Sequence, residues 1–219
     1  MRIIGFIPAR KGSKGLKNKN ILPLNGRPLI SYTIQAAKES KLDDIYVSSN
    51  IDEVETLCNE LKVKYTRRPE HLADDNSTMH ETIIDFINNI EIKFDAIMIL
   101  QPTSPLRNSH DINTSIENFK RHNSDCLVSV CKIPHNFSIE KQMVYQNGYL
   151  KGGLNLSNKQ SIKESYARNG AIYIIKKNKI YDYLVGGKIL MYEMPYFKSI
   201  DIESQEDLDI VNLLMDKYR

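Results

Sequence analysis

The residues best suited to chemistry lie near the N-terminus, in a loop dense in glycine and in cationic side chains. An apolar run at residues 3–7 leads directly into this loop, whose cations are Arg10, Lys11, Lys14, Lys17 and Lys19. Gly12 and Gly15 permit backbone conformations and close approaches that other residues resist. Backbone amides surrounded by positive charge are the groups that bind a triphosphate. The loop therefore predicts a polyanion site at the end of a strand, with a solvated basic surface loop as the alternative.

The two common glycine-rich phosphate motifs do not fit this loop. A Walker-type loop needs two glycines separated by four residues, followed by Lys and then Ser or Thr. Gly12 and Gly15 are separated by only two residues, and no such Gly-Lys pair follows. The dinucleotide fingerprint Gly-x-Gly-x-x-Gly is missing from the turn as well. The loop thus indicates a phosphate site of another kind.

A second polar stretch covers residues 67–81. Arg68 and a proline open it, and Ser77 and Thr78 follow, where they can cap a helix that carries Ile83 and Ile87. An arginine followed by hydroxyls suits an anion or a ribose. The alternative from the residues alone is that Arg68 pairs with a neighbouring acid of the same loop.

A third polar stretch follows the apolar run at residues 95–100. The turn reads Gln-Pro-Thr-Ser-Pro-Leu-Arg over residues 101–107, so two prolines flank Thr103 and Ser104. Prolines stiffen a turn and fix the directions in which its polar groups point. We expect either a substrate-facing turn or a plain strand exit with one hydroxyl capping nearby.

Two carboxylates lie near the C-terminus, at Asp201 and Glu203. In an extended segment, residues two apart point to the same side. Two acids on one side repel each other unless a cation or another positive partner lies between them, so the pair predicts a site for a metal ion or for another positive group. The alternative is that both acids simply favour the dipole of the last helix.

Apolar runs that alternate with amphipathic stretches predict the elements that carry these loops. Expected strands lie at residues 3–7, 44–49, 63–66, 95–100, 126–131, 166–175 and 191–194. Helices between strands imply crossover connections, a mostly parallel sheet and a ligand site beyond the carboxyl ends of its strands. We expect one α/β domain over residues 1–219, with a hairpin-bearing excursion at residues 132–165.

Composition narrows the function classes. The chain has 219 residues and a net charge of +3 that is well mixed outside the first loop, which argues against nucleic acid as a partner. No apolar run approaches a membrane span and the N-terminus lacks a signal-like prelude, so we expect no membrane association and a cytoplasmic protein. The three cysteines, Cys58, Cys126 and Cys131, lack metal-type spacing and predict buried free thiols.

The first loop also resembles a known signature. Residues 7–20, Ile-Pro-Ala-Arg-Lys-Gly-Ser-Lys-Gly-Leu-Lys-Asn-Lys-Asn, are similar to that of the CMP-sialic acid synthetases, or acylneuraminate cytidylyltransferases, which include the CMP-legionaminic and CMP-pseudaminic acid synthetases. The resemblance continues in order through the Arg-Pro loop at residue 68, the turn at residues 100–107, the Asn-Gly-Ala-Ile-Tyr run at 169–173 and the pair at 201–203. It departs at Glu203, where the family usually has aspartate.

The resemblance implies a Rossmann-like nucleotidyltransferase fold and a homodimer formed through the excursion. It implies transfer of CMP from CTP to the anomeric hydroxyl of a nine-carbon 2-keto acid sugar, with release of pyrophosphate and use of Mg²⁺. N-acetylneuraminic acid is the expected acceptor, with legionaminic acid next and pseudaminic or 3-deoxy-octulosonic acid as further alternatives. The alternative of another class is a regulatory protein that binds CTP without turnover.

The resemblance also assigns roles to individual residues. Phosphate, base and ribose contacts fall on Arg10, Ser13, Lys14, Asn20, Arg68, Ser77 and Thr78. Sugar contacts fall on Gln101, Thr103, Ser104, Tyr166, Arg168 and Asn169, and Arg168 stands where the position of the family arginine varies. Lys19, Arg10 and Asp201 are the expected catalytic residues, and Asp201 and Glu203 the expected metal ligands. The proton acceptor is either Asp201 or hydroxide made at the metal.

Overall fold

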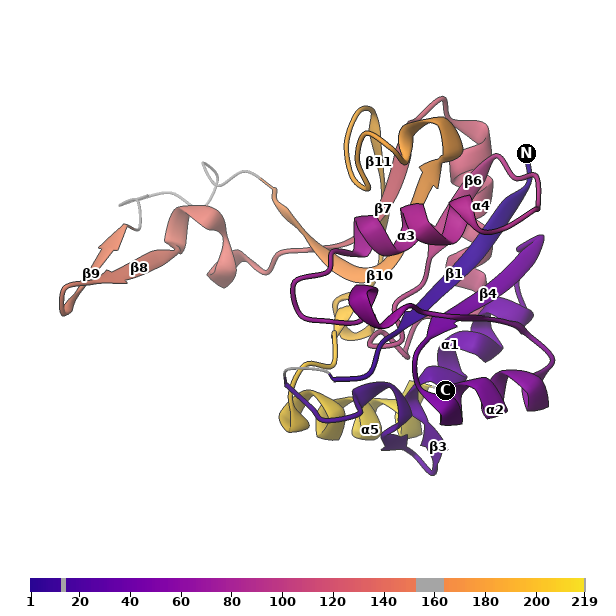
Figure 1. The fold of residues 1–219 in the computed structure, drawn as a ribbon. Helices are drawn as coiled ribbons and strands as arrows, with labels where there is room; N and C mark the ends of the chain where they lie inside the picture. The colour runs from indigo at the N-terminus through magenta and orange to yellow at the C-terminus, as the bar shows by residue number, and fades with distance from the viewer. Residues whose placement is uncertain (13–14, 153–163, 219) are drawn as a thin grey trace.

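The fold is built on a central twisted sheet, shown as a ribbon in Figure 1. The structure is a computed structural model, and it describes residues 1–12, 15–152 and 164–218. The sheet has seven strands in the order β11-β7-β10-β6-β1-β4-β5. Their bounds are β1 Ile3–Ala9, β4 Asp44–Ser49, β5 Lys64–Arg67, β6 Ala96–Ile99, β7 Cys126–Lys132, β10 Tyr166–Lys176 and β11 Ile189–Glu193. Neighbouring strands are parallel except at β10, which is antiparallel to β6 and β7, so the predicted mostly parallel sheet is confirmed.

Helices cover both faces of the sheet. Their bounds are α1 Leu29–Lys38, α2 Asp52–Leu61, α3 Met79–Asn88, α4 Ser109–Arg121 and α5 Gln205–Tyr218. The alternation of β1 divides its apolar side chains between two cores. Ile3 and Ile7 pack with α1, α2 and α4 on one face, whereas Ile4 and Phe6 pack with α3 on the other. Helix α5 closes a third, smaller cluster with the hairpin of β2 Pro23–Leu24 and β3 Arg27–Pro28.

The connections bring the polar loops to one edge of the sheet. Helix α1 joins β1 to β4, α2 joins β4 to β5, and α4 joins β6 to β7, and each joined pair runs parallel in the sheet. Loops that leave the carboxyl ends of parallel strands meet at the same edge. The basic loop after β1, the loop after β5 and the turn after β6 therefore lie together.

One local expectation was wrong. The Gly26-Arg27-Pro28 sequence predicts Pro28 inside the first turn of a helix, but α1 begins one residue later, at Leu29. Pro28 pairs with Pro23 in the short β2–β3 hairpin and has an extended backbone at the helix cap position. Its backbone carbonyl accepts a hydrogen bond from the Ser31 hydroxyl at 2.6 Å, which helps to fix the start of the helix.

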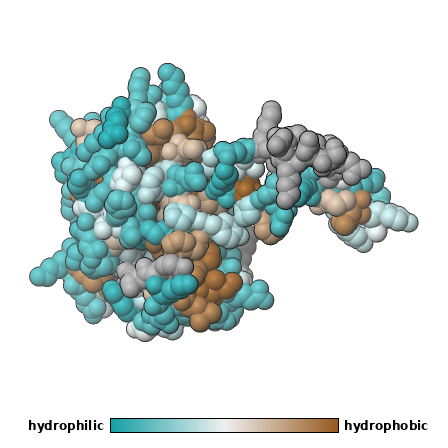
Figure 2. Space-filling view, turned by 180° about the vertical axis from the view of Figure 1, so that it is seen from behind, coloured by the Kyte–Doolittle hydropathy of each residue, from teal (hydrophilic) through white to brown (hydrophobic). Residues whose placement is uncertain are grey.

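An arm projects from the body between β7 and β10, as Figure 1 shows at the far left. It carries two short 3₁₀ helices and the hairpin of β8 Met143–Gln146 and β9 Tyr149–Gly152. The hairpin turn, Asn147-Gly148, has positive φ at both residues, which matches the twist of the strands. Apolar side chains at the tip are exposed and form the hydrophobic patch at the end of the arm in Figure 2. The rest of the expected excursion, residues 153–163, lies outside the described residues.

Candidate active site

A cavity of about 320 Å³ opens at the carboxyl edge of the sheet. Its wall gathers the polar loops that follow β1, β5 and β6, and it is rich in cationic and amide side chains. The lining residues used below are Arg10, Lys19, Asn20, Arg68, Gln101 and Thr103. Six residues predicted from three separate stretches of sequence thus meet at one cavity. Ser13 and Lys14, the two other phosphate candidates of the first loop, lie outside the described residues.

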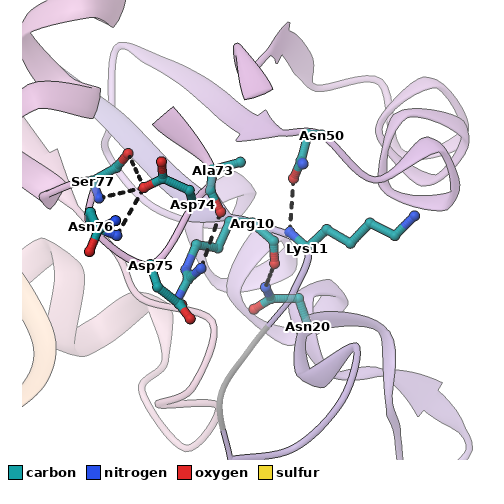
Figure 3. Close-up of polar contacts among 9 residues, drawn as sticks. All are labelled: Arg10, Lys11, Asn20, Asn50, Ala73, Asp74, Asp75, Asn76 and Ser77. Atoms are coloured by element: carbon teal, nitrogen blue, oxygen red, sulfur yellow. Dashed lines mark hydrogen bonds and ion pairs between the residues drawn. The ribbon is translucent and has the colours of Figure 1, made fainter. Parts of the chain in front are cut away.

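The basic loop is anchored to its neighbours by main-chain hydrogen bonds, as Figure 3 shows. The Lys11 amide donates to Asn50 Oδ1 at 2.8 Å, and Asn20 Nδ2 donates to the carbonyl oxygen of Arg10 at 3.0 Å. Gly12 has a φ of 80°, a conformation that favours glycine at this turn. The side chains of Arg10 and Lys11 point in opposite directions, and Lys11 holds the loop through its backbone bond to Asn50.

Arg10 links the basic loop to the loop that follows β5. Its guanidinium donates to the carbonyl oxygen of Ala73 at 3.1 Å and to Asp75 Oδ1 at 2.7 Å (Figure 3). The carboxylate of Asp75 is half exposed, so this ion pair exchanges readily for another anion. A guanidinium held at the rim by a carboxylate is well placed to bind a phosphate.

Arg68 is a buried cation with an unused donor. Only 4% of the residue is exposed, and its Nη2 has no hydrogen-bond partner among the described residues. The backbone is fixed because the Arg68 amide donates to the carbonyl oxygen of Ser49 at 2.8 Å. Burial, with the nearby charge of Arg10, lowers the pKa of the Arg68 guanidinium to about 10. A buried, unpaired donor favours a ligand that brings an acceptor into the cavity.

Ser77 and Thr78 are engaged in holding the loop. The Ser77 hydroxyl donates to the carbonyl oxygen of His71 at 2.6 Å. It also contacts Asp74 Oδ1 at 2.9 Å, as Figure 3 shows. Thr78 caps α3 in a capping box with Glu81, as the sequence predicts for a helix start. A nucleotide contact by either hydroxyl would therefore have to be added to these bonds or replace them. Met79, the next residue in the chain, lines the cavity, although no pattern in the sequence singled it out.

Lys19 places a nearly buried ammonium group in the cavity wall. Only 6% of the residue is exposed, and its Nζ lies 2.7 Å from Glu203 Oε1. The chain brings the two together because Gly15 lies against residue 203. A Cβ at Gly15 would lie 2.2 Å from the carbonyl oxygen of Glu203, so only glycine fits at this contact.

Asp201, which residue 202 separates from Glu203 in the chain, has a partly buried carboxylate. Burial and the nearby charge of Glu203 raise the pKa of the Asp201 carboxyl, although a hydrogen bond from the Thr103 side chain and the charge of Lys19 oppose the shift. Its Oδ1 is buried and has no partner among the described residues. A carboxylate oxygen in that state suits a divalent cation, because Mg²⁺ binds through one or two protein carboxylates with substrate phosphates and water. No cluster of three or more acidic, histidine or cysteine ligands occurs within the described ranges.

The turn after β6 is held by an arginine that sequence analysis did not single out. Arg107 is fully buried and donates to the carbonyl oxygens of Gln101 at 3.1 Å and Ala171 at 2.9 Å, and to Thr33 Oγ1 at 2.6 Å. Burial lowers the pKa of the Arg107 guanidinium to about 10, against the opposing charge of Asp111. Arg107 thus clamps the turn to β10 and α1. No sequence signal marks it, because arginine is rarely buried.

The strand β10 reaches the cavity through an irregular segment. Its pairing with β7 shifts register between Arg168 and Tyr173, and Gly170 within this segment has a φ of 75°. A Cβ at Gly170 would lie 3.0 Å from Gln101 Oε1 and 3.5 Å from Asp201 Oδ2. The segment therefore brings β10 against the turn and the carboxylate.

The three sugar candidates of β10 differ in their surroundings. Asn169 is buried, its Oδ1 accepts from the Ser129 hydroxyl at 2.6 Å, and its Nδ2 donates to the Ser199 hydroxyl at 2.9 Å. These bonds give Asn169 a structural role in fixing the irregular segment. Arg168 is exposed, and its charge and that of Asp201 both act on the Tyr173 hydroxyl, so Arg168 faces the same region. Tyr166 lies further along, near the root of the arm.

Two further predictions concern the whole chain. Cys58, Cys126 and Cys131 are buried and free, as predicted. None of the helices in the described ranges is both long and apolar enough to cross a membrane.

The fold and the cavity define an α/β protein with a cationic site at the carboxyl edge of its sheet. The chain matches the Cytidylyltransferase family over residues 4–215. It therefore belongs to the cytidylyltransferase family.

Relatives of known name agree with this assignment. The chain is 32% identical to the CMP-N,N'-diacetyllegionaminic acid synthase of Legionella pneumophila, over 99% of this chain and 97% of that protein. It is 32% identical to the N-acylneuraminate cytidylyltransferase of Streptococcus agalactiae, over 94% of this chain and 52% of that protein. It is 29% identical to the post-translational flagellin modification protein B of Campylobacter coli, over 97% of this chain and 94% of that protein. The chain thus spans about half the length of the N-acylneuraminate cytidylyltransferases it matches.

A solved structure confirms the Rossmann-like nucleotidyltransferase fold. The structure of a CMP:2-keto-3-deoxy-manno-octonic acid synthetase complexed with CTP superposes with a TM-score of 0.77, covering 99% of both chains at 16% identity. Identity at that level shows the fold alone.

Proposed function

We propose that this protein transfers CMP from CTP to the anomeric hydroxyl of a nine-carbon 2-keto acid sugar and releases pyrophosphate. The observation that carries the proposal is the cavity that gathers Arg10, Lys19 and Arg68. Three cations converging on one cavity suit a tetra-anionic nucleotide. Membership of the cytidylyltransferase family supports CTP as that nucleotide.

On the nucleotide side, Arg10 and Lys19 bind the phosphates, and Arg68 and Asn20 contact the base and ribose. Arg10 already binds a carboxylate oxygen of Asp75, and Lys19 binds one of Glu203, so both cations lie where they can bind anionic oxygens. The triphosphate takes the place of those carboxylates. Ser13, Lys14, Ser77 and Thr78 remain predicted contacts.

On the sugar side, Gln101 and Thr103 line the cavity, and Ser104 keeps a buried hydroxyl oxygen without a partner among the described residues. Arg168 offers a cation for the carboxylate of the sugar. Tyr166 stays a predicted contact, and Asn169 acts by holding the strand that presents Arg168.

The anomeric oxygen attacks the α-phosphorus, and the bond from that phosphorus to the bridging oxygen of the pyrophosphate breaks. Lys19 and Arg10 stabilise the charge that moves onto the departing pyrophosphate. The Asp201 carboxylate is our candidate acceptor for the hydroxyl proton, because its raised pKa makes it a stronger base. Asp201 also fits as the protein ligand of Mg²⁺, which neutralises phosphate charge when bound.

The acceptor has two leading candidates. N-acetylneuraminic acid is the sequence-based choice. A legionaminic-type acid is favoured by a separate observation, the match to the Legionella CMP-N,N'-diacetyllegionaminic acid synthase over nearly the whole of both chains. Both acids have nine carbons and a 2-keto carboxylate, so the chemistry above holds for either.

We also propose a homodimer formed through the arm, in the cytoplasm, where CTP is available. The hairpin of β8 and β9 exposes Val144, Tyr145, Tyr149 and Leu150, of which Tyr149 is 75% exposed. An apolar hairpin that projects from the body is stable only when another surface covers it. A second copy of the chain is the proposed cover.

Pyrophosphate release tests the proposed function. The purified protein is mixed with CTP, Mg²⁺ and each acid in turn, with GTP, ATP and UTP as matched nucleotide controls. We expect release with CTP and at least one nine-carbon acid, and a CMP-sugar product of the matching mass. Binding of CTP without release for any of the acids would instead support a regulatory CTP-binding protein.

A further inference from the structure

Glu203 and Asp201 are separated by a single residue, yet they contact different parts of the site. Glu203 Oε1 lies 2.7 Å from Lys19 Nζ, on the side of the basic loop. Asp201 Oδ2 lies beside Gly170, on the side of β10. Among the described residues, Lys19 forms an ion pair with Glu203 and not with Asp201, although its charge also acts on Asp201.

The basic loop and residue 203 are fitted to each other. The backbone carbonyl of Glu203 lies against Gly15, where a Cβ would be 2.2 Å away. The side chain then follows the loop, because its Oε2 would lie 3.9 Å from the same Cβ position. Glutamate reaches one methylene further than aspartate, which lets the carboxylate extend along the loop to Lys19.

Lys19 needs this counter-charge. A nearly buried ammonium is costly unless an anion or several acceptors compensate it. Within the described part of the chain, Lys19 forms its ion pair with Glu203, whose side chain is 64% exposed. An exposed carboxylate can hold the ammonium and still be displaced at little cost.

We propose that Glu203 is a positioning residue for Lys19 rather than a magnesium ligand. It holds the ammonium of Lys19 at the cavity wall in the nucleotide-free protein, and CTP displaces it when a phosphate takes its place. Asp201 is then the one carboxylate of the 201–203 pair that serves the metal. This inference rests on the proposed function, because it requires Lys19 to bind phosphate.

The test begins with CTP binding in EDTA, measured by calorimetry, where no metal contributes. Glu203→Gln removes the competing charge, so we expect CTP to bind about two- to five-fold more tightly than to the unsubstituted protein. The gain must depend on Lys19. In a Lys19→Met background the same Glu203→Gln change should have no effect, and Glu206→Gln, an exposed acid on α5, is the matched control for loss of a nearby charge.

The second arm measures metal directly. Mn²⁺ replaces Mg²⁺ as an electron paramagnetic resonance probe, titrated into the complex of protein and CTP. We expect Glu203→Gln to leave Mn²⁺ affinity unchanged and Asp201→Asn to weaken it by about tenfold or more.

Either of two results overturns the inference while leaving the proposed function intact. One is a Glu203→Gln gain that persists without Lys19, and the other is a loss of Mn²⁺ affinity in Glu203→Gln equal to that in Asp201→Asn. Failure of the unsubstituted protein to bind CTP, with or without metal, would overturn both the inference and the proposed function.

Discussion

Replacing Lys19 by methionine separates a catalytic role from a structural one. Methionine has nearly the length of lysine without its charge, so it fills the same enclosed space. The folded protein loses the ion pair with Glu203, whose side chain is 64% exposed. Because the carboxylate of this pair is exposed, solvent screens the interaction, and we expect it to contribute about 1 kcal/mol to the free energy of unfolding. In a chain of this size such a loss lowers Tm by roughly 2–4 °C.

The effect on turnover should be far larger. A charged contact to the departing pyrophosphate is worth about 3 kcal/mol in the transition state. Each 1.36 kcal/mol is a factor of ten, so kcat/KM should fall by about 150-fold in Lys19→Met. Because the contact strengthens as charge moves onto the leaving group, kcat should fall by more than KM rises.

The assay is pyrophosphate release under saturating Mg²⁺, with thermal unfolding followed on the same samples. Lys17→Met is the control, because Lys17 is an exposed lysine of the same loop. It should keep the rate within about two-fold, since exposed substitutions usually change little. A Lys19→Met rate within about three-fold of the unsubstituted protein, or a Tm loss large enough to explain the lost activity, would refute the reasoning.

Further perturbations address the remaining parts of the site. Asp201→Asn should abolish pyrophosphate release or raise the Mg²⁺ concentration that it requires, which a metal titration of the rate will show. Arg107→Leu should lower the free energy of unfolding by about 2–5 kcal/mol, measured by urea denaturation, because two buried carbonyls lose their donor. Arg68→Met should weaken CTP binding and reduce the preference for CTP over UTP in calorimetry. The thiols of Cys58, Cys126 and Cys131 should resist a disulfide reagent at pH 8 until the protein is unfolded, since all are buried and burial raises the pKa of Cys58 to about 11.

Local patterns predicted the elements of the fold well. The strand predicted at residues 44–49 has those bounds, and the amphipathic stretch that follows it forms the helix Asp52–Leu61. Each has its own signal, a run of apolar residues in one case and a 3.6-residue period in the other. Because short helical connections make strands parallel, the same patterns also placed the polar loops at one edge.

What the sequence could not predict depends on contacts between distant segments. Arg107 acts through carbonyls of the turn and of β10, which lie six and 64 residues away along the chain. The pairing of Lys19 with Glu203 requires the C-terminal segment to pack on Gly15. The side chain of Asn169 is engaged in hydrogen bonds with Ser129 and Ser199, because an irregular strand needs side chains to replace the backbone hydrogen bonds that it loses.

The charge pairing of the cavity assigns different tasks to its three cations. Arg10 and Lys19 already bind carboxylates, so a triphosphate that replaces those carboxylates exchanges one anion for another and gains little from the first contact. Arg68 has an unused buried donor, so an acceptor that reaches Nη2 adds a new hydrogen bond worth about 1–3 kcal/mol. We therefore expect recognition of the nucleotide to be concentrated at Arg68, and we expect Arg10 and Lys19 to act where charge develops during the proposed transfer.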